Sequence, residues 1–203
     1  MLDFVAMVTD DGVPMEAVAA YLDGLPPAAR REAAHALRRK EQRALYRKAL
    51  ASKGLTLADF VPADRAALTA VRHAGRNTLP LPGKHTYFEK RFCRPEDGSA
   101  RLFGYNEAPS RGLIGPGYFV ARSTEGEAEW TERGAIVVDY FLVPDGPVVA
   151  GWPTVVPNNK GLQVLVYHRT RDFMRRVSTH VTIGAAWKGE KSLDHYFVLV
   201  RQD

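Results

Sequence analysis

The feature that most constrains the fold is a change in the spacing of apolar residues near residues 77–84. Before this point alanine, leucine and arginine recur with the period of an amphipathic helix. After it come short runs of valine, isoleucine, tyrosine and phenylalanine, separated by glycine and proline, as in antiparallel strands. The pattern predicts an α+β protein, in which an N-terminal helical segment packs on a C-terminal, mainly antiparallel, strongly curved β-sheet or partial β-barrel.

The same change predicts the domain organisation. Residues 1–76 form the helical segment, which need not fold independently, and residues 84–203 form the antiparallel β domain. The expected helical segment comprises a strand or docked arm at 1–9, a short helix at 15–24, a long basic helix at 26–53 and a further helix at 62–73. The expected strands are 85–92, 100–105, 117–122, 134–143, 161–168, 177–183 and 194–201, with a short helix begun by Thr170 before the sixth. This spacing fits an open curved sheet as well as a closed barrel.

Cysteine content and the absence of targeting signals limit the cellular compartments in which the protein is expected. The 203 residues carry a formal net charge of +5 and one cysteine, Cys93. A single cysteine excludes an intramolecular disulfide and a multi-cysteine zinc site, which favours a reducing compartment. The first residues lack the basic region of a secretory signal, and no apolar run approaches the roughly 18–20 residues that span a bilayer. We therefore expect a cytoplasmic protein without a transmembrane segment.

The positive charge is concentrated in the predicted helix 26–53, which holds nine basic and two acidic residues. Such a helix could bind nucleic acid or an acidic protein through Arg38, Arg39, Arg43 and Arg47. However, the basic residues spread around the helix, and no recognised DNA-binding or RNA-binding spacing occurs. A solvated, solubilising face is the alternative interpretation.

Polar residues in the β domain define a candidate ligand site. Tyr105, Asn106 and Arg111 crowd a loop that follows a predicted strand, and loops on a rigid scaffold often carry sites. Trp152 lies in a long proline-rich loop and would stack over a ligand. Arg176 belongs to a cluster of arginines suited to a carboxylate or phosphate. These five residues are the expected ligand contacts, with the pocket at the open end of the sheet.

An enzyme on the same scaffold is the second interpretation. His180, which has polar neighbours in a predicted strand, titrates near neutral pH and is the candidate general acid or base. Asp139, which interrupts the apolar strand IVVDYFLV, or Glu107 would orient it. The structural alternatives are a hydrogen-bonded histidine, an arginine-paired aspartate and a surface turn.

Recognised catalytic and cofactor motifs do not occur in the sequence. The histidines lack HxH and HExxH spacing, and the glycine-rich segment 112–117 lacks the Lys-Ser/Thr of a phosphate-binding loop. The sequence therefore indicates no metal site and no particular cofactor. The leading interpretation is a small-ligand-binding β domain with a helical extension. Catalysis by His180 with Asp139 or Glu107, and partner binding through the basic helix, are the alternatives.

Overall fold

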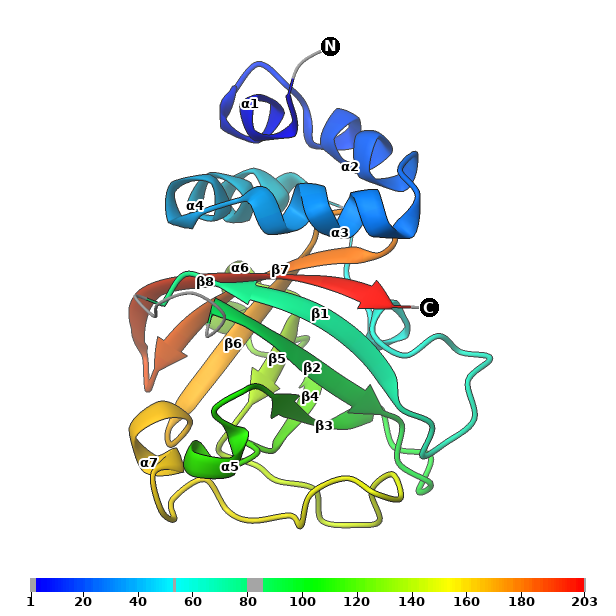
Figure 1. Cartoon of the computed structure of the whole chain (residues 1–203), viewed down its shortest axis with the longest axis vertical. Coiled ribbons are helices and arrows are strands. Elements are labelled where there is room, and N and C mark those ends of the chain that lie inside the picture. Colours follow the sequence, from blue (N-terminus) through cyan, green and yellow to red (C-terminus); the bar gives the residue numbers. More distant parts are fainter. Residues whose placement is uncertain (1–2, 53, 80–85, 203) are drawn as a thin grey trace.

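The computed structural model of the protein describes residues 3–52, 54–79 and 86–202. Four helices lead the chain and lie on one side of a β-barrel, with the third and fourth next to the barrel and the first two beyond them (Figure 1). They are α1 (Phe4–Thr9), α2 (Met15–Asp23), α3 (Pro27–Ala36) and α4 (Arg39–Lys48). The expected strand or arm at residues 1–9 is thus a helix over most of its described length.

The predicted helix 26–53 is divided into α3 and α4 at Leu37 and Arg38, both of which have extended backbone. Leaving the helix lets the Leu37 side chain become fully buried beneath the helices. The break is stabilised by capping, because the Arg38 backbone N–H donates to Glu41 Oε2 at 2.9 Å. The buried Gln42 amide donates to the Leu37 carbonyl at 3.0 Å, which satisfies a carbonyl that the broken helix would leave unpaired.

Eight antiparallel strands form the barrel, each paired with the next in sequence. They are β1 (Val71–Asn77), β2 (Tyr87–Cys93), β3 (Arg101–Glu107), β4 (Phe119–Ser123), β5 (Ile136–Asp139), β6 (Thr170–Arg176), β7 (Val181–Lys188) and β8 (Lys191–Gln202). β8 also pairs with β1, so the sheet closes. The predicted fold class is confirmed, and closure leaves no unpaired sheet edge.

Several predicted element boundaries were wrong. The expected helix 62–73 consists of turns followed by the start of β1, because pairing with β2 and β8 overrides the helical preference of this alanine-rich segment. The expected strand 161–168 contains the short helix α7 (Gln163–Val166). The segment after Thr170, expected to be a helix, is strand β6. The strand expected at 177–183 begins only at Val181, so His180 lies in the turn before β7.

Both ends of the barrel are covered by short segments. At one end, here called the η2 end, the 3-10 helix η2 (Leu57–Asp59) leads into Phe60, whose ring packs on Phe92 at 5.0 Å between centroids. At the other, the α7 end, Tyr167 stacks on Tyr140 at 5.2 Å. The remaining short helices are η1 (Ala49–Ala51), α5 (Arg111–Ile114) and α6 (Ala128–Arg133), and α5 lies beside α7 in Figure 1.

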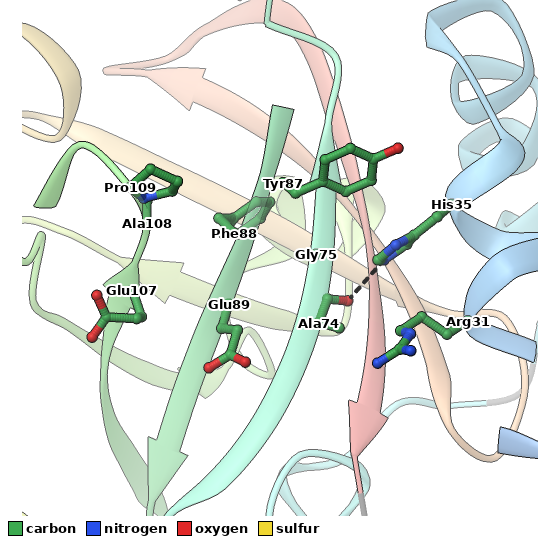
Figure 2. A pocket seen from close by; sticks show the side chains of 10 residues that line it. All are labelled: Arg31, His35, Ala74, Gly75, Tyr87, Phe88, Glu89, Glu107, Ala108 and Pro109. Carbon is green, nitrogen blue, oxygen red and sulfur yellow. Dashed lines mark hydrogen bonds between the residues drawn. The ribbon is translucent and has the colours of Figure 1, made fainter. Parts of the chain in front are cut away.

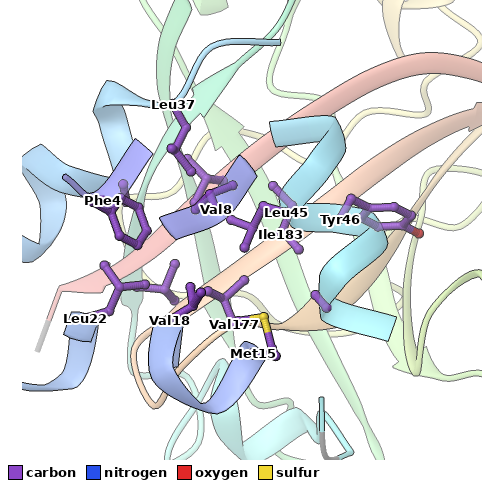
Figure 3. Close-up of a cluster of buried hydrophobic side chains, with 14 of the residues drawn as sticks. Phe4, Val8, Met15, Val18, Leu22, Leu37, Leu45, Tyr46, Val177 and Ile183 are labelled. Atoms are coloured by element: carbon purple, nitrogen blue, oxygen red, sulfur yellow. The ribbon is translucent and has the colours of Figure 1, made fainter. Parts of the chain in front are cut away.

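The helices share a hydrophobic core with the outer face of the barrel. Side chains of the four helices form one hydrophobic cluster with Ile183 of β7 and with Val177, which follows β6. Figure 3 shows part of this cluster. Val181, Val198 and Val200 complete this face of the barrel, and each is at most 1% exposed. A second core fills the barrel itself. No helix among the described residues is long and apolar enough to cross a membrane.

Candidate functional site

A groove of about 560 Å³ runs between α3 and the outer face of β1, β2 and β3. Arg31 and His35 reach into it from α3, and Tyr87 lies beside them (Figure 2). Glu89 and Glu107 line the opposite side, from neighbouring strands. Its volume lies within the range of about 300–1,000 Å³ that is typical of small-molecule sites.

The two glutamates are direct cross-strand partners, Glu89 on β2 and Glu107 on β3. Like charges at such positions repel, so each carboxylate needs a cation nearby. Arg72 and Arg91 donate to Glu89, whose ion-pair distances are 2.6 and 2.9 Å. Burial alone would raise the pKa of Glu89, but the hydrogen bonds from the two arginines outweigh it and leave this pKa lowered. Both the charge and the position of Glu89 are therefore held by its neighbours.

Glu107 is held from the other side of the groove. Arg111 Nε donates to Glu107 Oε1 at 2.7 Å, and the Tyr105 hydroxyl donates to Oε2 at 3.1 Å. Each carboxylate has about four lone-pair positions, so these bonds leave acceptor capacity facing the groove. The result is a pair of oriented carboxylates on a rigid sheet.

The α3 wall carries positive charge and a histidine. Arg31 donates to the Gln202 amide oxygen at 3.3 Å and forms no ion pair within the described part of the chain. His35 Nε2 lies 3.4 Å from the Ala74 carbonyl, and its ring lies 5.5 Å from that of Tyr87. Burial lowers the pKa of His35, the Ala74 carbonyl opposes this shift, and Arg31 and Arg76 add to the lowering. His35 is thus neutral near pH 7.

The lowered pKa of His35 predicts a pH dependence of stability. The unfolded histidine has a pKa of about 6.5 and binds a proton before the folded one does, so its stabilising contribution is present above pH ~6.5. That contribution is lost as pH falls from ~6.5 through the lower folded pKa. We expect His35→Gln to remove this part of the loss in urea-unfolding free energy measured between about pH 7.5 and 5. An unchanged difference between the two pH values would contradict the assignment to His35.

Beneath the groove, the barrel encloses a buried charged cluster. Lys90 Nζ lies 3.1 Å from Asp172 Oδ2, and the two side chains are 2% and 8% exposed. Lys90 also donates to Asn106 Oδ1 at 3.0 Å and to the Tyr140 hydroxyl. Asn106 in turn donates to the Gly117 carbonyl at 3.0 Å, so the cluster is anchored to the segment that covers the α7 end.

Aromatic rings complete the surroundings of the Lys90 ammonium. The centroids of Phe119, Tyr140 and Phe197 lie 4.9–5.0 Å from Nζ, and that of Phe88 lies at 5.8 Å. Rings at this distance stabilise a cation through their negative faces. Burial nevertheless lowers the pKa of Lys90 and raises that of Asp172, and each group partly opposes the shift of the other. Phe88 also lines the groove, so its ring contacts both the groove and this cluster.

The structure separates the residues that the sequence grouped as ligand contacts. Asn106 points into the barrel, whereas Tyr105 points outward and packs against Trp152 at 5.0 Å between ring centroids. Arg111 lies near Tyr105 through their shared bonds to Glu107. Tyr105, Glu107, Arg111 and Trp152 are therefore neighbours on the outer face of the barrel, and Glu107 alone of the predicted residues lines the groove.

The candidate acid–base residues lie apart. Asp139 pairs with Arg171 at the start of β6, and its carboxylate accepts from Arg171 Nε at 3.0 Å. His180 follows the end of β6 at the η2 end, where its Nδ1 lies 3.2 Å from a guanidinium nitrogen of Arg201. Arg176 is also at the η2 end, 3.3 Å from Asp59. Asp139 lies opposite Arg171, near the start of β6, whereas His180 lies beyond Arg176 at its end. At about 3.3 Å per strand residue, the two side chains are roughly 20 Å apart along the strand direction.

The basic residues of α3 and α4 have different surroundings. Arg39 and Arg43 both pair with Asp194, which ties α4 to β8. Hydrogen bonds from Arg43 and Arg39 lower the pKa of Asp194 to about 2. Arg38 and Arg47 are exposed. Arg39 and Arg43 therefore stabilise the contact between α4 and β8, and among the residues that the structure describes only part of the basic surface is left without an acidic partner of this kind.

Sequence reasoning missed most residues of the groove and of the buried cluster. Arg31 and His35 were counted only as part of a helix, and Glu89 only as part of a strand. Lys90 had a usable signal, because strand alternation places it on the same face as Phe88 and Phe92. A lysine on an apolar strand face needs a buried partner, and only the barrel shows that this partner is Asp172.

Within the described ranges, no group of three or more histidine, cysteine, aspartate or glutamate side chains could hold a metal ion. Cys93 is buried, and this burial raises the pKa of its thiol to about 11, so the thiolate is disfavoured. Models of known protein families, curated proteins and solved structures were all compared with the chain, and none of them matches it.

Proposed function

We infer that the protein binds a small zwitterionic ligand in the groove between α3 and the barrel. The observation that carries this proposal is the arrangement of charge, with Arg31 on one wall and the paired carboxylates of Glu89 and Glu107 on the other. A ligand ammonium would lie between the carboxylates, and a ligand carboxylate would pair with Arg31. An amino acid or a related amine-bearing acid has this chemistry.

The apolar part of the groove supports a ligand with a flat or aromatic body. Tyr87 is 44% exposed, which leaves much of its ring open to a ligand. The neutral His35 ring lies next to it, and Phe88 and Pro109 add apolar surface. Stacking on an exposed tyrosine adds affinity beyond the area that it buries.

The proposal is tested by titrating three probes that share a phenyl ring and differ in their charged groups. These are phenylalanine, phenylalanine amide, which lacks the carboxylate, and 3-phenylpropionate, which lacks the ammonium. Isothermal titration calorimetry is expected to show the tightest binding for phenylalanine. Glu107→Gln should weaken phenylalanine and its amide, and Arg31→Gln should weaken phenylalanine and phenylpropionate, each by about 10-fold or more because a charge-assisted bond is lost.

Glu129→Gln provides the matched control, because Glu129 lies on α6 and its side chain is 82% exposed. It removes the same charge from the protein without touching the groove. Equal binding of all three probes, or equal weakening by Glu107→Gln and Glu129→Gln, would argue against recognition of the ligand's charged groups by the groove.

Catalysis by His180 has less support, because Asp139 and Glu107 both lie toward the opposite end of the barrel. Partner binding through the basic helix likewise lacks a specific observation in its favour. Ligand binding in the groove uses Glu107, a predicted residue that lines it.

A further inference from the structure

Large exposed apolar side chains gather at the α7 end of the barrel. Six of the eight large hydrophobic residues exposed within the described ranges lie in α5, beside or within α7, or directly after β5. They are Leu113, Phe141, Leu142, Leu162, Leu165 and Val166. Leu113 and Leu165 are each 74% exposed. Single exposed leucines are common, but a cluster of this kind marks an interaction surface.

The fold holds α5 and α7 together and turns their apolar side chains outward. The Gly117 backbone N–H, just beyond α5, donates to the Gln163 side chain of α7 at 2.8 Å. Gln163 and Tyr167 lie four residues apart and therefore share the inner face of the α7 turn, where Tyr167 stacks on Tyr140. Leu165 lies between them in sequence and must face outward. In Figure 1 both short helices lie at the end of the barrel away from α1 and α2.

Positive charge lies along the α7 side of this apolar surface. Lys160 precedes α7, Arg169 follows it, and both are exposed. The turn between β7 and β8 lies next to Arg169, because the Gly189 backbone N–H donates to the Arg169 carbonyl at 2.8 Å. This turn adds the exposed lysines 188 and 191.

The acidic side chains at the same end do not cancel this charge. Each pairs with an arginine: Glu107 with Arg111 at 2.7 Å, Glu190 with Arg133 at 2.6 Å, Asp139 with Arg171 at 3.0 Å and Asp194 with Arg39 at 2.6 Å. The surface therefore combines protruding leucines with unneutralised cations. An anionic lipid surface complements both features, because its headgroups pair with the cations and its acyl region takes up the leucines.

We propose that the α7 end docks on the surface of a bilayer that contains anionic lipid. Leu113 and Leu165 enter the interface between headgroups and acyl chains, and Lys160, Arg169, Lys188 and Lys191 contact the headgroups. This docking is independent of ligand binding in the groove, and each can fail without the other.

The test is co-sedimentation of the full chain with vesicles of phosphatidylcholine alone or of phosphatidylcholine mixed with phosphatidylglycerol. Binding is expected only to the mixed vesicles, and it should fall as salt is raised because headgroup contacts are screened. The double variant Leu113→Ser/Leu165→Ser should partition into these vesicles at least about 10-fold less than the wild type. Both side chains are exposed, so the thermal unfolding of this variant should match that of the wild type.

Two control variants locate the docking surface. Leu50→Ser removes a leucine that is 66% exposed in η1, next to the helical layer, and should leave vesicle binding unchanged. Lys160→Glu/Lys188→Glu should weaken binding, whereas the equally large charge change Arg38→Glu/Arg47→Glu, at the N-cap of α4 and within it, should not. Weakening by the α4 pair alone would move the lipid contact to the basic helix and overturn the proposal.

Two further results would also overturn it. One is the absence of binding to the mixed vesicles at low salt. The other is self-association in sedimentation velocity that the Leu113→Ser/Leu165→Ser variant abolishes, because a second copy of the chain would then cover this surface.

Discussion

Replacing Lys90 with methionine is expected to lower the free energy of unfolding by about 3–5 kcal/mol, because the change leaves the Asp172 carboxylate buried without its cation. Methionine has a similar length and keeps the contact with the rings of Phe119 and Phe197. The loss therefore reports the unpaired charge more than a cavity. Urea unfolding followed by tryptophan fluorescence measures it.

The companion variant removes both charges. Lys90→Met/Asp172→Leu is expected to recover most of the stability that Lys90→Met loses, since replacing a buried ion pair by apolar side chains is often neutral or stabilising. Asn106 and Tyr140 retain their mutual hydrogen bond in this variant. If the double variant were as unstable as Lys90→Met, the hydrogen bonds of the pair would contribute more to stability than the neutralisation of the buried charge. A stable Lys90→Met variant would show that Asp172 accepts a proton at little cost.

The second large effect concerns the helical segment. A chain that begins at Gly54 is expected to lose cooperative folding or to aggregate, because it exposes the outer face of β7 and β8. Val181, Ile183, Val198 and Val200 would each lose roughly 1.5–3 kcal/mol of burial energy. Their sum is comparable with the total stability of a typical domain, about 5–15 kcal/mol.

The measurement compares size-exclusion elution and thermal unfolding of the shortened and the full chain. Adding a separate polypeptide of residues 1–53 should restore solubility, because it supplies the missing cover. A monomeric shortened chain with the unfolding midpoint of the full chain would mean that the helices are an appendage, and that the barrel is an independent domain.

The change from helices to strands illustrates how far sequence patterns reach. Helical spacing in the first part and strand-like runs in the second part correctly predicted the order of the two regions. The expected helix 62–73 was wrong, since Ala66, Ala67 and Ala70 suggested a helix where the chain turns into β1. Local preference is weak there, and β1 forms because β2 and β8 both supply hydrogen-bond partners.

The candidate site shows a different limit. Glu107 was identified as a polar residue in a loop, and it does line a groove. Its partner Glu89 could not be identified, because their proximity depends on the register between β2 and β3. Likewise Tyr105 and Asn106 are neighbours in sequence but point to opposite faces of β3, as strand alternation requires.

The sequence by itself determined the α+β class, the antiparallel character of the sheet and the concentration of basic residues before residue 54. These properties follow from the spacing of apolar residues and from composition, which act over a few residues. Only the tertiary structure decided that the sheet closes, that Lys90 meets Asp172 inside it and that α3 forms one wall of a groove. Those features depend on contacts between residues distant in sequence, and the register and closure that create them depend on the packing energy of the whole barrel.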